Sequence, residues 1–259
     1  MSKVIDAIAL LGAAVIEGLI SLGRFVIFLL TAALYIFEPP YKPRLAIRQM
    51  RIIGAESLFL VVLIAAFTGM VLGLQGYVTL SKFGSESALG TVVALTLVRE
   101  LGPVLAALMV TARAGSAMAA ELGSMQVTEQ IDAMTVMAVN PVQYLVSPRL
   151  LAGVISFPLL TAIFDVVGIL GGYLIGVGLM HGPSAAYFNG IQDNLGAHDI
   201  MSGFYKALVF GLVITWVCCY KGYHAARMAV GIGRATTEAV VLSSVLVLVW
   251  DYFLTSVLL

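Results

Sequence analysis

Two adjacent charged residues, Arg99 and Glu100, lie inside a long apolar stretch and are the first candidates for chemistry in this sequence. An ionisable side chain at the centre of a membrane helix costs roughly 2.5–3.5 kcal/mol, so such groups usually face a cavity or a polar partner. Pro103 cannot donate a backbone hydrogen bond, which leaves the carbonyl oxygen of Arg99 free. The pair indicates either a polar lining to a cavity or two charges that neighbouring helices satisfy.

Two further acids, Asp165 and Asp251, fall in other apolar stretches. Together with Glu100 they suggest an alternative function, a secondary transporter that passes protons along intramembrane carboxyl groups. The sequence lacks the inverted internal repeat that is common in such transporters. Asp251 is close to the C-terminus and is also compatible with the membrane interface, and Asp165 with a contact between helices. A membrane scaffold without transport activity is a third interpretation.

Motifs for nucleotide, metal or acyl-transfer chemistry are absent from the sequence. It contains no G-x-x-x-x-G-K-[ST] phosphate loop, no H-E-x-x-H and no G-x-S-x-G. Cys218 and Cys219 are adjacent within an apolar run, which fits neither a disulfide framework nor a metal site. We therefore expect no enzyme activity, no cofactor and no metal. The net charge of zero argues against a nucleic-acid partner.

The elements that must position these residues are expected to be membrane helices. The chain is 61% hydrophobic and only 11% charged, whereas soluble domains carry roughly 25% charged residues. About 20 apolar residues span a bilayer as a helix. An all-α integral membrane protein is predicted, and its five spans are residues 57–80, 88–112, 150–180, 204–220 and 239–259.

Residues 1–45 are predicted to form an interfacial helix before the first span. The apolar run at residues 25–37 is short for a crossing. Asp6, Glu17 and Arg24 would share one side of a helix, as in helices that lie in the membrane interface. A sixth crossing is the alternative.

The distribution of lysine and arginine predicts the orientation, because cytoplasmic segments carry the excess of these residues. With five spans and a cytoplasmic N-terminus, eleven of them fall on the inner side, and only Lys82 and Lys206 fall on the outer side. This places the C-terminus outside, residues 113–148 inside and the connection at 181–203 outside. A sixth span would reduce the ratio to nine against four.

Two further patterns concern packing and docking. Gly168, Gly172 and Gly176 form a strip of small residues that lets a helix approach closely, either within the chain or at a homodimer seam. In the inner segment, Val127, Ile131, Met134 and Ala138 recur at helical spacing, and Asn140–Pro141 is expected to end that helix. Its apolar face predicts contact with the membrane surface or with a soluble partner.

Several blocks in one order resemble the MlaE/YrbE permease family over nearly the whole chain. They are residues 68–77 (TGMVLGLQGY), 97–103 (LVRELGP), 112–123 (ARAGSAMAAELG), 128–130 (TEQ), 137–141 (MAVNP), 147–153 (SPRLLAG) and 231–240 (GIGRATTEAV).

The resemblance implies a homodimeric permease of an ABC transporter in the bacterial inner membrane, with an interfacial N-terminal helix and five spans. It implies a separate cytoplasmic ATPase that docks on a coupling helix in residues 113–148 and hydrolyses the ATP. A STAS-domain protein and a periplasmic MCE-domain hexamer are the other implied partners. The implied cargo is phospholipid, which is moved between the inner and outer membranes to maintain outer-membrane lipid asymmetry.

The resemblance also assigns site residues. The implied lipid-binding residues are Leu72, Gln75, Tyr77, Phe83, Arg99 and Glu100; some members have Tyr where this chain has Phe83. The implied ATPase-coupling residues are Arg113, Glu121, Met125, Glu129, Gln130 and Met134.

Overall fold

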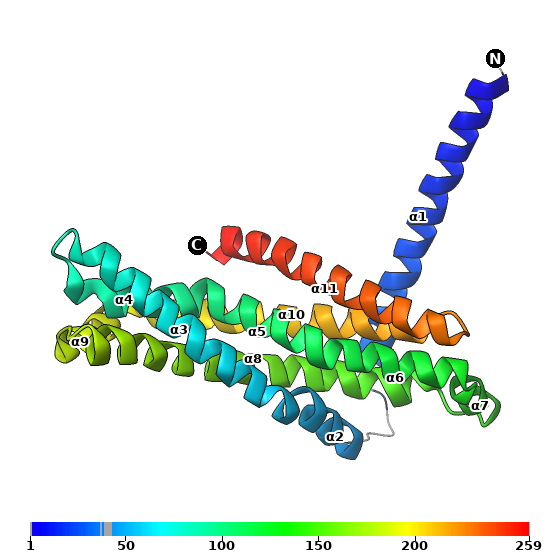
Figure 1. The fold of residues 1–259 in the computed structure, drawn as a ribbon. Coiled ribbons are helices and arrows are strands. Elements are labelled where there is room, and N and C mark those ends of the chain that lie inside the picture. Colours follow the sequence, from blue (N-terminus) through cyan, green and yellow to red (C-terminus); the bar gives the residue numbers. More distant parts are fainter. Residues whose placement is uncertain (1, 37, 39–42, 259) are drawn as a thin grey trace.

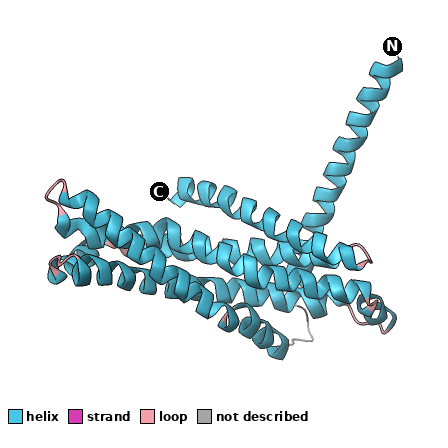
Figure 2. Cartoon of the chain, viewed as in Figure 1, coloured by secondary structure: helices cyan, strands magenta, loops and turns pink. Residues whose placement is uncertain are grey.

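The structure is a computed structural model that describes residues 2–36, 38 and 43–258. These residues form helices joined by short connections, and no strand occurs among them (Figure 2). The α-helices are α1 (Ser2–Leu34), α2 (Pro43–Ile53), α3 (Leu58–Ser81), α4 (Leu89–Thr96), α5 (Gly102–Val110), α6 (Ser116–Val127), α7 (Gln130–Val136), α8 (Ser147–Tyr173), α9 (Ser184–Asn194), α10 (Ala197–Tyr223) and α11 (Ala229–Leu258). Short 3₁₀ turns (η1, Ala55–Ser57; η2, Glu86–Ala88) and π-helical turns (η3, Leu97–Leu101; η4, Thr111–Gly115; η5, Val142–Val146; η6, Leu174–Leu179) join several of them into longer rods.

Six helical stretches in the described residues are long and apolar enough to cross a membrane. They are Ile16–Leu34, Pro43–Ser81, Glu86–Val127, Val142–Leu179, Ala197–Tyr223 and Ala229–Leu258. The last five match the five predicted spans, of which 150–180 and 239–259 extend one residue beyond the observed stretches, so the all-α membrane architecture is confirmed. Backbone groups have no water to bond to inside a bilayer, which is why every one of these stretches is continuous helix.

The apolar part of helix α1 is longer than the run at residues 25–37 that the sequence suggests. It is one continuous helix, and its stretch Ile16–Leu34 has the length and composition of a crossing. Its N-terminal part projects away from the bundle (Figure 1). Its C-terminal part packs on α10, where Phe25 stacks on Trp216 at a ring-centroid distance of 3.9 Å. Glu17 and Arg24 of the predicted polar stripe are exposed, and the side chain of Asp6 lies outside the described residues.

The helical rod that contains the second predicted span is longer than predicted. It includes the first part of the predicted inner segment, residues 113–148. The rod Glu86–Val127 continues past residue 112 through α6, which packs on α10 and α11. The chain turns at Glu129, whose φ of 56° is left-handed, and α7 then ends at Val136. The prediction that one helix runs to Asn140–Pro141 is therefore wrong. Asn140 instead accepts a hydrogen bond from the Val142 backbone at 3.0 Å and caps the next rod.

The predicted glycine strip of α8 packs within the chain. A Cβ added to Gly69 of α3 would lie 1.8 Å from the carbonyl oxygen of Gly168, and one on Gly73 would lie 2.7 Å from that of Gly172. Further along the strip, a Cβ on Gly176 would meet the Leu89 side chain at 2.4 Å. Small residues allow this close approach of two helices. The strip is an α3–α8 contact, so the homodimer seam is not needed to explain it.

The expected outer connection at 181–203 contains a helix, α9, which packs on α4 at one end of the bundle (Figure 1). Tyr187 of α9 is buried, and its hydroxyl donates to the Ile169 carbonyl at 2.9 Å. Burial raises the pKa of this phenol above its ordinary value. Helices α6 and α7 lie at the opposite end, so the two ends of the bundle are structurally distinct.

Candidate functional site: a lysine-centred polar cluster

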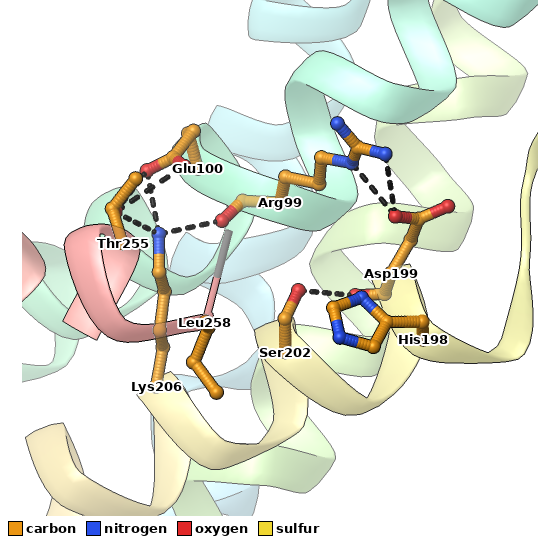
Figure 3. Close-up of a pocket in the computed structure, with 8 residues that line it drawn as sticks. All are labelled: Arg99, Glu100, His198, Asp199, Ser202, Lys206, Thr255 and Leu258. Atoms are coloured by element: carbon orange, nitrogen blue, oxygen red, sulfur yellow. Dashed lines mark hydrogen bonds and ion pairs between the residues drawn. The ribbon is translucent and has the colours of Figure 1, made fainter.

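A buried lysine of α10 organises the polar groups inside the bundle. Lys206 is 1% exposed, and its ammonium donates to Glu100 Oε2 at 2.6 Å, to Thr255 Oγ1 at 2.7 Å and to the Arg99 carbonyl oxygen at 2.8 Å (Figure 3). An ammonium has three donors, so all three are satisfied. The lysine, itself in the fourth of the long helical rods that follow α1, thereby joins the second rod to the last.

The bond to the Arg99 carbonyl follows from the backbone around Pro103. The proline lies at the start of α5, directly after the π-helical turn η3, and it has no N–H to donate to the carbonyl four residues earlier. A carbonyl left without a partner in an apolar medium costs free energy. The carbonyl oxygen of Arg99, which the sequence predicts to be free, therefore accepts a hydrogen bond from Lys206.

Arg99 points away from Glu100, toward Asp199 (Figure 3). Its Nε and Nη2 lie 2.8 and 2.7 Å from Asp199 Oδ1. Asp199 is 5% exposed and also accepts the Gly196 N–H at 2.9 Å, which fixes the carboxylate at the start of α10. Adjacent helical residues face different directions, so each member of the Arg99–Glu100 pair has its own partner on α10.

Asp251 completes the cluster from α11. Its Oδ1 lies 3.2 Å from the Lys206 ammonium as an ion pair, so this carboxylate faces α10. Asp165 lies elsewhere, with its Oδ1 against Gly102 and without a hydrogen-bond partner. No hydrogen bond or ion pair among residues 43–258 joins Asp165 to Glu100 or Asp251. These three acids therefore do not form the continuous path that the proton-relay alternative requires.

The cluster borders a cavity of about 160 Å³. Arg99, Glu100, His198, Asp199, Ser202, Lys206, Thr255 and Leu258 line it. Pockets that enclose a drug-sized ligand are roughly 300–1,000 Å³. The cavity therefore has room for a polar fragment such as a headgroup, and a whole two-chain lipid would need additional walls.

Within the described residues, the predicted lipid-binding residues are divided among different environments. Leu72 and Gln75 line a separate cavity of about 290 Å³ between α3 and α4, with Thr79 and Thr96 as further polar walls. Tyr77 packs on the main apolar core. Phe83 is 78% exposed in the connection after α3.

The predicted ATPase-coupling residues also separate into different environments. Arg113 donates to the Ile52 carbonyl at 2.6 Å and pairs with Glu56, so it holds the α2–α3 junction. Glu121 accepts a hydrogen bond from buried Arg149 at 2.7 Å. Glu129 and Gln130 are exposed at the turn before α7.

The two predicted methionines pack inward. Met125 and Met134 are partly buried against the apolar cluster that contains Ile131. Exposed apolar side chains at the end of α7 are instead Val136, 87% exposed, and Met137, 67% exposed. Ile131 and Met134 of the predicted apolar face therefore pack inward, whereas Val127 ends α6 and Ala138 is exposed beyond the end of α7, so the four residues do not share one helix face.

Neither Lys206 nor Asp199 is among the site residues that the sequence predicts. The charge distribution predicts an outer-side position for Lys206, because this residue lies near the end of its span. A lysine inside an apolar window was nevertheless an available signal, because an intramembrane charge needs a partner. For Asp199, the start of a helix after Gly196 was the corresponding signal.

Comparisons with known proteins identify the family of the chain. A model of the family described as Permease MlaE matches residues 46–257. A Haemophilus influenzae protein named "Intermembrane phospholipid transport system permease protein MlaE" is 42% identical over 258 residues, 98% of each chain. A "Probable ABC transporter permease protein" of Rickettsia conorii is 46% identical over 235 residues, 91% of each chain, and one of Synechocystis is 36% identical over 221 residues, 85% of this chain and 84% of the relative. The chain is a multi-pass membrane protein that belongs to the MlaE permease family.

Proposed function

We propose that the chain is the permease subunit of an ABC transporter that moves phospholipids between the inner and outer membranes and so maintains outer-membrane lipid asymmetry. The family membership and the name of the Haemophilus relative support this function. They favour it over the proton-coupled alternative. The chain would lie in the bacterial inner membrane with α1 at the interface, its N-terminus cytoplasmic and its C-terminus periplasmic. ATP hydrolysis belongs to a separate subunit.

The observation that carries the proposal is the polar cluster around Lys206 in an otherwise apolar bundle. The Arg99 side chain is 40% exposed, and its Nη1 forms no hydrogen bond within residues 43–258. A guanidinium held by Asp199 in this way is ready to bind a phosphate through charge-assisted hydrogen bonds. Glu100 and Lys206 form the opposite wall of the same cavity.

A homodimer supplies the walls that one chain lacks. Apolar side chains at helical spacing are exposed along α3, namely Phe59, Leu63, Phe67, Val71, Leu74 and Val78. We infer that this face meets acyl chains or the second copy near the dimer axis. There Leu72, Gln75, Tyr77 and Phe83 would contact the lipid together with Arg99 and Glu100.

The α6–α7 end is proposed as the docking site of the cytoplasmic ATPase, which a STAS-domain protein would bind in turn. Glu129 and Gln130 would supply polar contacts, and Val136 and Met137 would supply apolar ones. Glu121 and Met125 would support this end from α6. A periplasmic MCE-domain hexamer would sit at the opposite end, near α9.

The test is reconstitution of the chain with its ATPase and MCE partners in liposomes, followed by measurement of ATP-dependent transfer of a labelled phospholipid. Replacing Arg99 by glutamine is expected to lower the transfer rate about tenfold, by the loss of one charge-assisted contact. Arg44→Gln, an exposed change outside the cavity, is the matched control.

Retained assembly with loss of lipid transfer in Arg99→Gln would argue against a scaffold without transport. Transfer driven by a pH gradient without ATP would instead support the proton-coupled alternative and overturn the proposal.

A further inference from the structure

A basic helix face lies at the α7 end of the bundle, far from the Lys206 cavity. Helix α2 carries three exposed arginines at i, i+4 and i+7, a spacing that places them on one face. They are Arg44, Arg48 and Arg51. None forms an ion pair with a residue in the described part of the chain. The opposite face of α2 is apolar, with Ala46 and Ile53 buried.

Beside this face is a cavity of about 110 Å³ between α2, α6 and the start of α8. Its innermost charged residue is Arg149, which is 1% exposed. The guanidinium donates to the Leu145 carbonyl and to Glu121 Oε2, both at 2.7 Å, but its Nε is buried without a hydrogen-bond partner. Arg48 lines the entrance. Gln49 on the same wall also has a buried Oε1 without a partner. Buried polar atoms without partners are costly, so this wall is a place where a polar ligand would add hydrogen bonds.

The charge balance indicates that the ligand is an anion. Two arginines, Arg48 and Arg149, line the cavity against one carboxylate, Glu121, which already binds the Nη2 of Arg149. One positive charge therefore remains. A phosphate matches both guanidinium groups, because arginine presents its donors in a planar fork. The side chain of Gln49 adds an amide to the wall.

An apolar groove on the same two helices indicates the source of the phosphate. A second cavity of about 220 Å³ has almost purely apolar walls, and Met50 and Gly54 contribute to it from the α2 side. On α8 its walls include Ile155, Leu159 and Ile163. At 1.5 Å per residue, these three follow Arg149 by roughly 9 to 21 Å, which suits one acyl chain. Helix α2 leads directly into the α3 crossing, so it begins at a membrane surface.

We propose that α2 and α8 hold a resident acidic phospholipid, with its phosphate at Arg48 and Arg149 and one acyl chain in the adjacent groove. This site is separate from the proposed transport cavity. Cys219 packs in the same apolar cluster as Leu145 and Leu150, next to Arg149, and it follows Lys206 on α10 by roughly 20 Å of helix. The lipid would hold α2 against α8 and is not the cargo.

The test is native mass spectrometry of the purified, delipidated full complex titrated with phosphatidylglycerol or phosphatidylcholine. Arg48→Gln is expected to weaken phosphatidylglycerol binding about fivefold, the effect of one arginine at a lipid surface. Arg51→Gln is the matched control on the same helix and is expected to leave binding unchanged. An equal loss in both variants would mean diffuse surface attraction and would overturn the site.

The groove is tested separately. Leu159→Trp fills it and is expected to reduce phosphatidylglycerol binding, whereas Leu170→Trp, an exposed change on the same helix outside the groove, is not. If inorganic phosphate competes fully and Leu159→Trp has no effect, the site binds a free anion and the lipid proposal is wrong. The readout is equilibrium binding without ATP, so a failure of the transport function would leave this result unaffected.

Discussion

The ammonium of Lys206 lies 2.6 Å from the Glu100 carboxylate, although the two residues are 106 positions apart in the chain. The same ammonium is bonded to the carbonyl that Pro103 leaves without a backbone donor. A single side chain therefore neutralises an intramembrane acid and repairs the hydrogen bonding of a proline-interrupted helix. Both effects make Lys206 a structural centre as well as a wall of the cavity.

Removing this lysine is expected to destabilise the protein. Lys206→Met leaves Glu100 and Asp251 without their cation, and we expect a loss of about 3 kcal/mol, the low end for broken buried pairs because the Glu100 side chain is 38% exposed. Thermal unfolding in detergent measures the change. Lys82→Met, on an exposed lysine, is the control. Adding Glu100→Gln to Lys206→Met should recover part of the loss, and additive effects would contradict the pairing.

The α3–α8 contact is expected to tolerate no side chain at Gly69. In Gly69→Ala the new methyl group would overlap the Gly168 carbonyl, so the helices must separate, at a cost of about 1–3 kcal/mol or more. Gly178→Ala is the matched control, because its Cβ meets nothing within 4 Å. Yield and melting temperature of the detergent-purified protein measure both variants. Equal stability of the two would show that α3 and α8 are not in contact.

The buried hydroxyl of Tyr187 is expected to contribute stability that is lost at high pH. Tyr187→Phe removes its hydrogen bond to Ile169 and should cost about 1 kcal/mol at neutral pH. Because burial raises the pKa of Tyr187, the unfolded chain loses this proton first, from about pH 10. The contribution of the phenol should therefore be complete below pH 10 and decline above it. Unfolding of both proteins between pH 8 and 11 tests this, and a constant difference would contradict it.

The docking proposal predicts that substitutions of two methionines near α7 affect different properties, ATPase stimulation for one and stability for the other. Met137→Asp changes an exposed side chain and should abolish stimulation of the partner ATPase with little change in stability. Met134→Asp introduces a charge into the apolar cluster and should lower the melting temperature. ATPase assays of the complex and melting of the isolated permease separate the two. Full ATPase stimulation by Met137→Asp would place the docking surface elsewhere.

The membrane helices could be predicted from the sequence because a bilayer imposes local requirements. Some 20 apolar residues are needed for each crossing, and each backbone group must be satisfied within its own helix. The same local reasoning identified Arg99 and Glu100 as charges in need of partners and the Arg99 carbonyl as an acceptor without a backbone donor. Each of these inferences depends only on residues within a few positions of one another.

Only the tertiary structure decided which groups meet. Lys206 near the end of a span has the same local pattern whether it faces the outside or the interior, and helix packing places it beside Glu100. Helix packing likewise determines that Gly168 of α8 lies against Gly69 of α3. Near α7, the helix ends early and Ala138 takes a φ of 57°, so Met134 points inward and Met137 outward. Sequence periodicity describes one face of one helix, whereas these outcomes depend on how several helices cross.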